Sequence, residues 1–216
     1  MSTEINITKN LTLTTTGTSG AATLVGSTLN IPQYSGGGAS GVYASIPLGS
    51  GLVYSNIPLG SSNVTLAPSV NQMYLMPFTP QNTFTTSSII INISGAALST
   101  SSRVLIYSHS ISTGLPGTKI YESTDLNTGT TGVKTATTSQ TFTAGTTYWL
   151  GVYSNGSPLF TASSTSGQFI IGSDSGNLTY TSIQAAATYG SAPTTFVAAS
   201  ASRINNNFPK IGLIVA

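Results

Sequence analysis

The stretch Thr141–Ser154, TFTAGTTYWLGVYS, predicts the centre of the fold. It contains the chain's only tryptophan, Trp149, and turn residues bound it at Gly145 and at Asn155-Gly156. Side chains alternate between the two faces of a strand. One face would carry Tyr148, Leu150 and Val152, and the other Trp149, Gly151 and Tyr153. Because both faces carry large side chains, we expect this strand inside a β-sandwich and away from a sheet edge.

Similar short apolar runs, separated by Gly, Pro, Asn and Asp turns, continue along the chain. No window has a helical period, and the only helix-friendly patch, residues 185–187, is too short for a helix. Strands are predicted at 72–79, 88–94, 103–109, 117–123, 131–138, 146–154, 167–172, 178–183 and 210–216. We therefore predict an all-β protein with a β-sandwich or jelly-roll head over residues 64–216.

Charged residues are unusually rare in this chain. They make up 5% of it, against about 25% in an average soluble domain. No formal charge occurs from Asn10 to Ser102, and the net charge of +2 is too small and dispersed to indicate nucleic-acid binding. The hydrophobic content of 39% still indicates a folded chain. The chain has no apolar run of about 18 residues, so we expect no membrane span. The first residues do not resemble a secretory signal.

The first third of the chain reads as an arm followed by a linker. Residues 5–8 and 11–15 alternate between apolar and polar, which predicts two short strands. We assign residues 1–40 to an anchoring arm and 41–63 to a Gly/Pro-rich linker, in which the unit 43–50 recurs at 54–61. The arm has too few apolar residues for a core of its own, so it must dock on the main domain, sister chains or a host structure. The expected anchoring residues are Leu11, Leu13, Leu24, Leu29 and Ile31.

The run TTTGTSGAATLVGSTLNIPQYS, residues 14–35, resembles a segment that recurs in tail-fibre and other virion fibre proteins of tailed bacteriophages. It covers about a tenth of the chain. The resemblance implies a virion structural protein, a fibre or capsid-decorating subunit that is commonly trimeric. Its arm would bind capsid or tail proteins, and it would be made in the host cytoplasm. The resemblance marks no catalytic residues.

A looser pattern is similar to β-sandwich modules of phage and other surface proteins. A strand ending in tyrosine, Arg103–Tyr107, leads through Pro116-Gly117 towards Gly145 and the Tyr148-Trp149 pair. The pattern implies a fold and no activity.

Few side chains can carry chemistry, because the chain has one histidine, four acids and no cysteine. A Ser-His-Asp triad around His109 can be assembled on paper, but no nucleophile motif supports it, and a strand end is the simpler interpretation. Glu122 and Asp125 could form a glycosidase pair; we interpret them as a solvated rim. Asp125 and Asp174 lie in segments that Asx turns explain without calcium. We therefore expect no enzymatic activity, metal or cofactor.

Tyrosine offers another possibility, since aromatic faces can stack on sugars. We expect most of the ten tyrosines to pack in the sandwich. Tyr180 and Tyr189 lie in a polar segment and are the candidate glycan contacts. The alternatives to a virion structural protein are therefore a carbohydrate-binding receptor-recognition module and, less favoured, a polysaccharide depolymerase.

Overall fold

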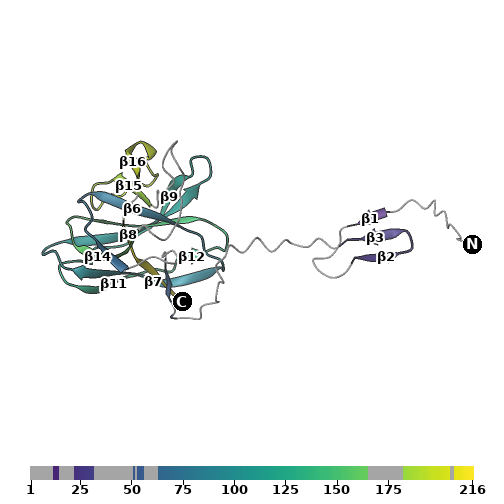
Figure 1. Cartoon of the computed structure of the whole chain (residues 1–216), viewed down its shortest axis with the longest axis horizontal. Helices are drawn as coiled ribbons and strands as arrows, with labels where there is room; N and C mark the ends of the chain where they lie inside the picture. Colours follow the sequence, from purple (N-terminus) through teal and green to yellow (C-terminus); the bar gives the residue numbers. More distant parts are fainter. Residues whose placement is uncertain are drawn as a thin grey trace, which may run out of the picture. The chain divides into compact units, whose positions relative to one another are not determined.

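The chain divides into two units, Met1–Ala44 and Ser45–Ala216. A computed structural model describes residues 12–14, 22–31, 51, 53–55, 63–164, 182–204 and 207–216. The predicted strands at 5–8 and 167–172, the turn at Asp174, and Leu11 and Tyr180 lie outside these residues. Figure 1 labels strands of both units where there is room.

Ser45–Ala216, which we call the head, is an all-β sandwich, as the sequence predicted. One layer, the β13 sheet, is antiparallel throughout. Its strands in spatial order are β10 (Leu126–Asn127), β8 (Ser101–Ser110), β13 (Tyr148–Ser154), β6 (Gln72–Phe78), β15 (Ser182–Ala186) and β16 (Ala201–Ile204), and β9 (Leu115–Glu122) also pairs with β8. The central strand β13 lies between β8 and β6, and all of its residues are buried.

The second layer, the β7 sheet, is built around one long strand, β7 (Phe84–Gly95). Its strands in spatial order are β17 (Phe208–Pro209), β14 (Leu159–Ser163), β7, β18 (Ile211–Val215) and β4 (Val53–Ser55). Two further strands, β11 (Gly132–Thr137) and β12 (Thr141–Phe142), pair with β7, and β5 (Asn63–Leu66) pairs with β14.

Alternation along the strands builds the core between the two sheets. Tyr148, Leu150 and Val152 of β13 belong to the same buried cluster as Ile89 and Ile91 of β7. The prediction that these three β13 residues share a face is therefore confirmed.

The outer face of the β13 sheet is also apolar. Trp149 is 1% exposed and is paired in register with Tyr107 of β8. A segment of the chain covers this face: residues 187–200, which we call the covering segment, contribute Ala187, Ala192 and Phe196 to the same cluster as Trp149. The segment includes the short 3₁₀ helix η1 (Ala198–Ser200).

Backbone hydrogen bonds attach the covering segment to β9 and to the turn before β6. Lys119 N donates to Thr194 O (2.7 Å), and Phe196 N donates to Gly117 O (2.8 Å). At the other end, Ala187 N donates to Asn71 O (2.9 Å). The covering segment is thus an irregular third layer of the head, held along its length.

Residues 185–187 form no helix, as expected from the shortness of the patch: Ala185 and Ala186 belong to β15, and Ala185 pairs with Met73 and is fully buried. Two other sequence-based expectations need correction. The expected linker 41–63 contributes Val53–Ser55 to the sandwich, where β4 pairs with β18. The strand expected at 88–94 runs from Phe84 to Gly95, because successive partners extend its pairing at both ends. Within the described ranges, no helix is long and apolar enough to cross a membrane.

Met1–Ala44 contains a three-stranded sheet of β1 (Thr12–Thr14), β3 (Thr28–Asn30) and β2 (Thr23–Val25). The parallel β1–β3 pairing and the antiparallel β2–β3 pairing place Leu13, Leu29 and Leu24 opposite one another. We call these residues the leucine row. Leu24 is 63% exposed and Ile31 is 41% exposed, so this sheet does not cover its own apolar groups.

Candidate functional site

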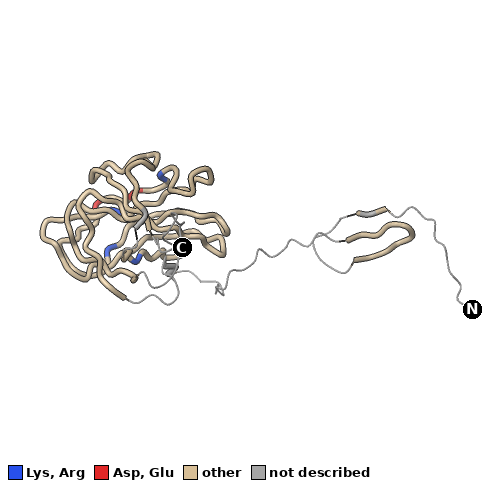
Figure 2. Tube along the Cα trace, turned by 45° about the horizontal axis from the view of Figure 1, so that its top comes forward, with Lys and Arg blue, Asp and Glu red and all other residues tan. Residues whose placement is uncertain are grey.

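Charged side chains gather on the outer face of the β13 sheet, beside the covering segment. Figure 2 shows how few charges the described residues of the head carry. Arg103 extends from β8, Lys119 and Glu122 from β9, and Asp125 from the loop that follows β9. With two cations and two anions, this charged cluster is the strongest candidate for an active site.

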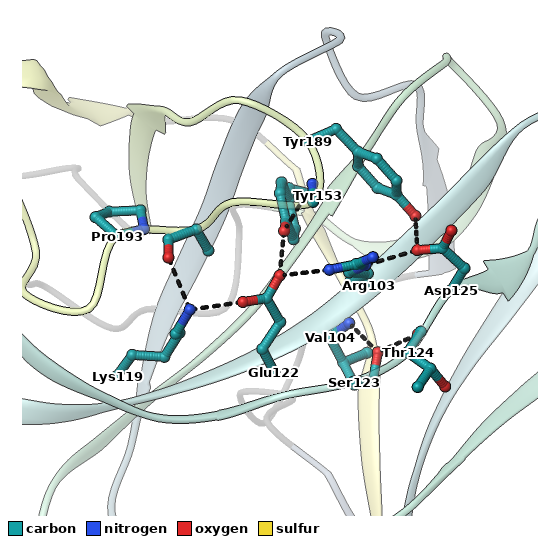
Figure 3. Close-up of polar contacts among 12 residues, drawn as sticks. Arg103, Val104, Lys119, Glu122, Ser123, Thr124, Asp125, Tyr153, Tyr189 and Pro193 are labelled. Atoms are coloured by element: carbon teal, nitrogen blue, oxygen red, sulfur yellow. Dashed lines mark hydrogen bonds and ion pairs between the residues drawn. The ribbon is translucent and has the colours of Figure 1, made fainter.

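Glu122 lies at the centre of the cluster (Figure 3). Arg103 Nη1 donates to its Oε1 at 3.0 Å, and Lys119 Nζ donates to its Oε2 at 2.6 Å. The Tyr153 hydroxyl also donates to Oε1. The Glu122 side chain is only 13% exposed, so the expectation of a solvated rim is wrong for this residue. Removing a carboxylate from water requires compensating donors, and three side chains provide them.

Asp125 is more accessible, with 51% of its side chain exposed. Arg103 Nε donates to its Oδ1 at 2.6 Å, and the Tyr189 hydroxyl donates to the same atom at 2.9 Å. The Arg103 guanidinium also lies 5.4 Å from the centre of the Tyr189 ring, which is within the range of a cation–π contact. Arg103 therefore joins both carboxylates and the aromatic ring.

The charged cluster also holds the covering segment. Lys119 Nζ donates to Ala192 O at 2.7 Å, and Gly190 N donates to the Tyr153 hydroxyl oxygen at 3.2 Å. Tyr107, which lies nearby in the apolar layer, donates to Pro193 O at 2.7 Å. These three hydrogen bonds hold the covering segment where it crosses the outer face of the β13 sheet.

Both carboxyl groups are held ionised. Burial raises the pKa of Glu122, but the hydrogen bonds from Lys119, Tyr153 and Arg103 outweigh burial, and the net pKa is below its usual value. The hydrogen bond from Arg103 lowers the pKa of Asp125, and the Tyr189 hydroxyl lowers it further. Burial, together with the bond to Glu122, raises the pKa of Tyr153 to about 12. Both acids thus act as acceptors at neutral pH.

This arrangement does not match the needs of a glycosidase. Such an enzyme requires one protonated carboxyl group with a raised pKa to protonate the leaving group. In the charged cluster the pKa of each acid is lowered, and Arg103 binds both of them. The geometry therefore favours a structural role, in which the ion pairs fasten the covering segment to the sheet.

His109 lies outside the charged cluster, near the end of β8. Its Nδ1 accepts a hydrogen bond of 3.1 Å from Trp149 Nε1, and the two rings are stacked with centroids 6.2 Å apart. No hydrogen bond or ion pair joins it to Glu122 or Asp125. The structure therefore does not assemble the triad considered from the sequence with either of these acids. Among the described residues, no three His, Cys, Asp or Glu side chains are grouped to hold a metal ion.

The candidate glycan contacts and the anchoring residues are only partly described. Tyr189 is half-buried, and both its ring and its hydroxyl interact with other residues of the head. Leu24, Leu29 and Ile31 lie in or next to the three-stranded sheet, and the backbone of Leu13 pairs with Leu29.

The sequence did give a signal for the charged cluster: four of the ten charged residues (six basic and four acidic) lie between Arg103 and Asp125.

Acid is expected to release the covering segment before the sandwich unfolds. Because the pKa of Glu122 and that of Asp125 are lowered in the folded state, their stabilisation is present above their unfolded pKa values of about 4 and is lost as the pH falls through the lowered values. Arg103 and Lys119 would then lack counter-charges.

Hydrogen exchange measured by mass spectrometry, corrected for intrinsic exchange rates, checks this expectation. Peptides from 187–200 should lose protection as the pH falls below about 4, whereas those from β7 remain protected. Simultaneous loss of protection in both regions would contradict it.

No protein-family model matches this chain, and no curated protein matches it in sequence.

Proposed function

We propose that this chain is a non-enzymatic structural protein of a bacteriophage virion, a fibre or capsid-decorating subunit. The N-terminal unit anchors it, and the head is displayed for surface decoration or host attachment. The observation that carries the proposal is the exposed apolar surface of the three-stranded sheet, where Leu24 is 63% exposed. The resemblance of residues 14–35 to phage fibre proteins supports the virion setting.

The exposed apolar groups of the N-terminal unit support association. Leu24 is 63% exposed and Val25 76% exposed, and no described residue of the unit covers them. Burying a leucine side chain contributes about 1.5–3 kcal/mol, whereas ordering the backbone costs about 1–2 kcal/mol per residue. A sheet of such short strands therefore gains much of its stability from other chains. We propose a homotrimer, which attaches to further virion proteins through the same unit.

The chemistry of the head supports the non-enzymatic part of the proposal. Glu122 and Asp125 are ionised and bound to Arg103, and His109 accepts a hydrogen bond from Trp149. The titratable groups near the covering segment are thus used for internal contacts. A depolymerase would need an acid that is free to give up a proton, so this alternative is the less favoured.

Sedimentation of the full chain tests the proposed association. Wild-type protein is expected to sediment as a trimer, and the double variant Leu24→Ser/Leu29→Ser is expected to lose on the order of a hundredfold in association constant for each chain of the trimer, because roughly 3 kcal/mol of burial is lost per chain. Thr23→Ser, in the neighbouring row of the same sheet, is the matched control and should remain trimeric.

A chain that begins at Ser45 should stay folded, with Trp149 buried, but sediment as a monomer. A full-length monomer, or a trimer that persists without residues 1–44, would contradict the proposal.

A further inference from the structure

A cavity of about 400 Å³ lies at the β15–β16 side of the β13 sheet. Its volume falls within the range of about 300–1,000 Å³ that is usual for ligand sites. The side chains that line it include Ser69, Val70, Gln72, Gln184, Ser200 and Ser202. None of the residues that line it carries a charge.

The cavity forms where the inner face of the β13 sheet changes from apolar to polar. Cross-strand register connects Val104, Val152, Tyr74, Gln184 and Ser202 in one row over β8, β13, β6, β15 and β16. Residues in one such row lie on the same face of a sheet. The first two belong to the core between the sheets, whereas Gln184 and Ser202 line the cavity. The floor of the cavity is therefore a continuation of the rigid core face.

The polar side chains that line the cavity keep hydrogen-bonding capacity that the described residues of the head do not use. Gln184 Nε2 donates to the Tyr74 hydroxyl oxygen at 3.4 Å, and Ser69 N donates to the same oxygen at 3.0 Å. The Gln72 amide makes no hydrogen bond to another described residue, although Gln72 is half-buried at the end of β6. Each glutamine amide offers both donors and an acceptor.

We infer that this cavity binds a neutral saccharide. A ring with several hydroxyl groups can satisfy amides and serine hydroxyls as donor and acceptor at once, and its C–H face can contact Val70, which is 47% exposed. An ionic ligand would meet no opposite charge among the lining residues. The inference rests on the proposed role of the head in host attachment. It names the ligand class that the head would take.

Side-chain amide resonances of the full-length protein provide the test. We would titrate the protein with three neutral probes, maltose, lactose and N,N′-diacetylchitobiose, at millimolar concentration. At least one probe is expected to shift the Gln72 and Gln184 amide signals and to leave Gln81, an exposed glutamine in the loop after β6, unchanged. Gln72→Ala/Gln184→Ala should weaken binding at least tenfold, and Gln81→Ala should not.

Trp149 emission would confirm that the variants are folded. The inference is wrong if none of the probes shifts these signals, if binding survives in the double variant, or if an uncharged peptide binds the cavity in preference to every sugar. The proposed association is tested by sedimentation and the saccharide site by amide resonances. A negative result for saccharide binding therefore leaves the sedimentation result unchanged, and the two proposals can fail separately.

Discussion

Replacing Glu122 with alanine is expected to destabilise the head by on the order of 3 kcal/mol, because it leaves neighbouring charges without their common partner. Glu122 accepts from Arg103, Lys119 and Tyr153 while its side chain is only 13% exposed. Urea unfolding followed by Trp149 emission would measure the loss.

Two controls separate this effect from a general effect of charge. Asp125→Asn removes an acid that is half exposed, so its cost should be at most about 1 kcal/mol. Lys134→Ala removes a cation whose ammonium binds Thr130 and Thr131 outside the charged cluster, and should cost less than about 0.5 kcal/mol. Equal losses for all three variants would show that the cluster does not fasten the covering segment.

A methyl group at Gly151 is expected to be as harmful as the loss of a large core side chain. A Cβ at this position would lie 2.4 Å from Leu75 Cδ2 and 2.8 Å from the carbonyl oxygen of Tyr74. Gly151 lies in the middle of β13, with a paired strand on each side, so the backbone cannot move away. Overpacking of a core usually costs about 1–3 kcal/mol, and we expect Gly151→Ala to reach about 3 kcal/mol.

A double-mutant cycle with Leu75→Ala tests this cause. Leu75→Ala alone should cost about 2–5 kcal/mol. The double variant should cost at least about 1 kcal/mol less than the sum, because the smaller side chain leaves room for the added methyl group. Strict additivity would mean that the contact with Leu75 is not the reason for glycine at this position.

The sequence predicted the sandwich because the apolar pattern that defines it is local. Alternation around Trp149 placed Tyr148 and Leu150 on one face and Tyr153 on the other, and a strand with two bulky faces could only be an inner one. The second apolar layer was harder to predict. The covering segment has no strand period, and its place depends on contacts with residues as distant in sequence as Asn71.

The charged cluster was missed for a related reason. Glu122 and Asp125 lie in a strand end and a loop, which in an ordinary chain indicates solvent exposure. Their partner Arg103 comes from the neighbouring strand, and Tyr189 from the far end of the chain. In a chain with only ten charged residues (six basic and four acidic), however, four within one hairpin region is itself unusual. That local density was the signal available before the structure.

The position of β18 has a consequence for synthesis on the ribosome. Ile211–Val215 is inserted between β7 and β4, and Ile211 and Leu213 fill the core between the layers. The nascent chain therefore cannot close the β7 sheet until residue 215 has emerged from the exit tunnel. Until then, the isoleucine-rich edge of β7 is exposed to other nascent chains, and such unpaired edges invite aggregation. Folding of the head is thus expected to be completed after translation of this segment, and ribosomes stalled before residue 211 should carry a protease-sensitive head.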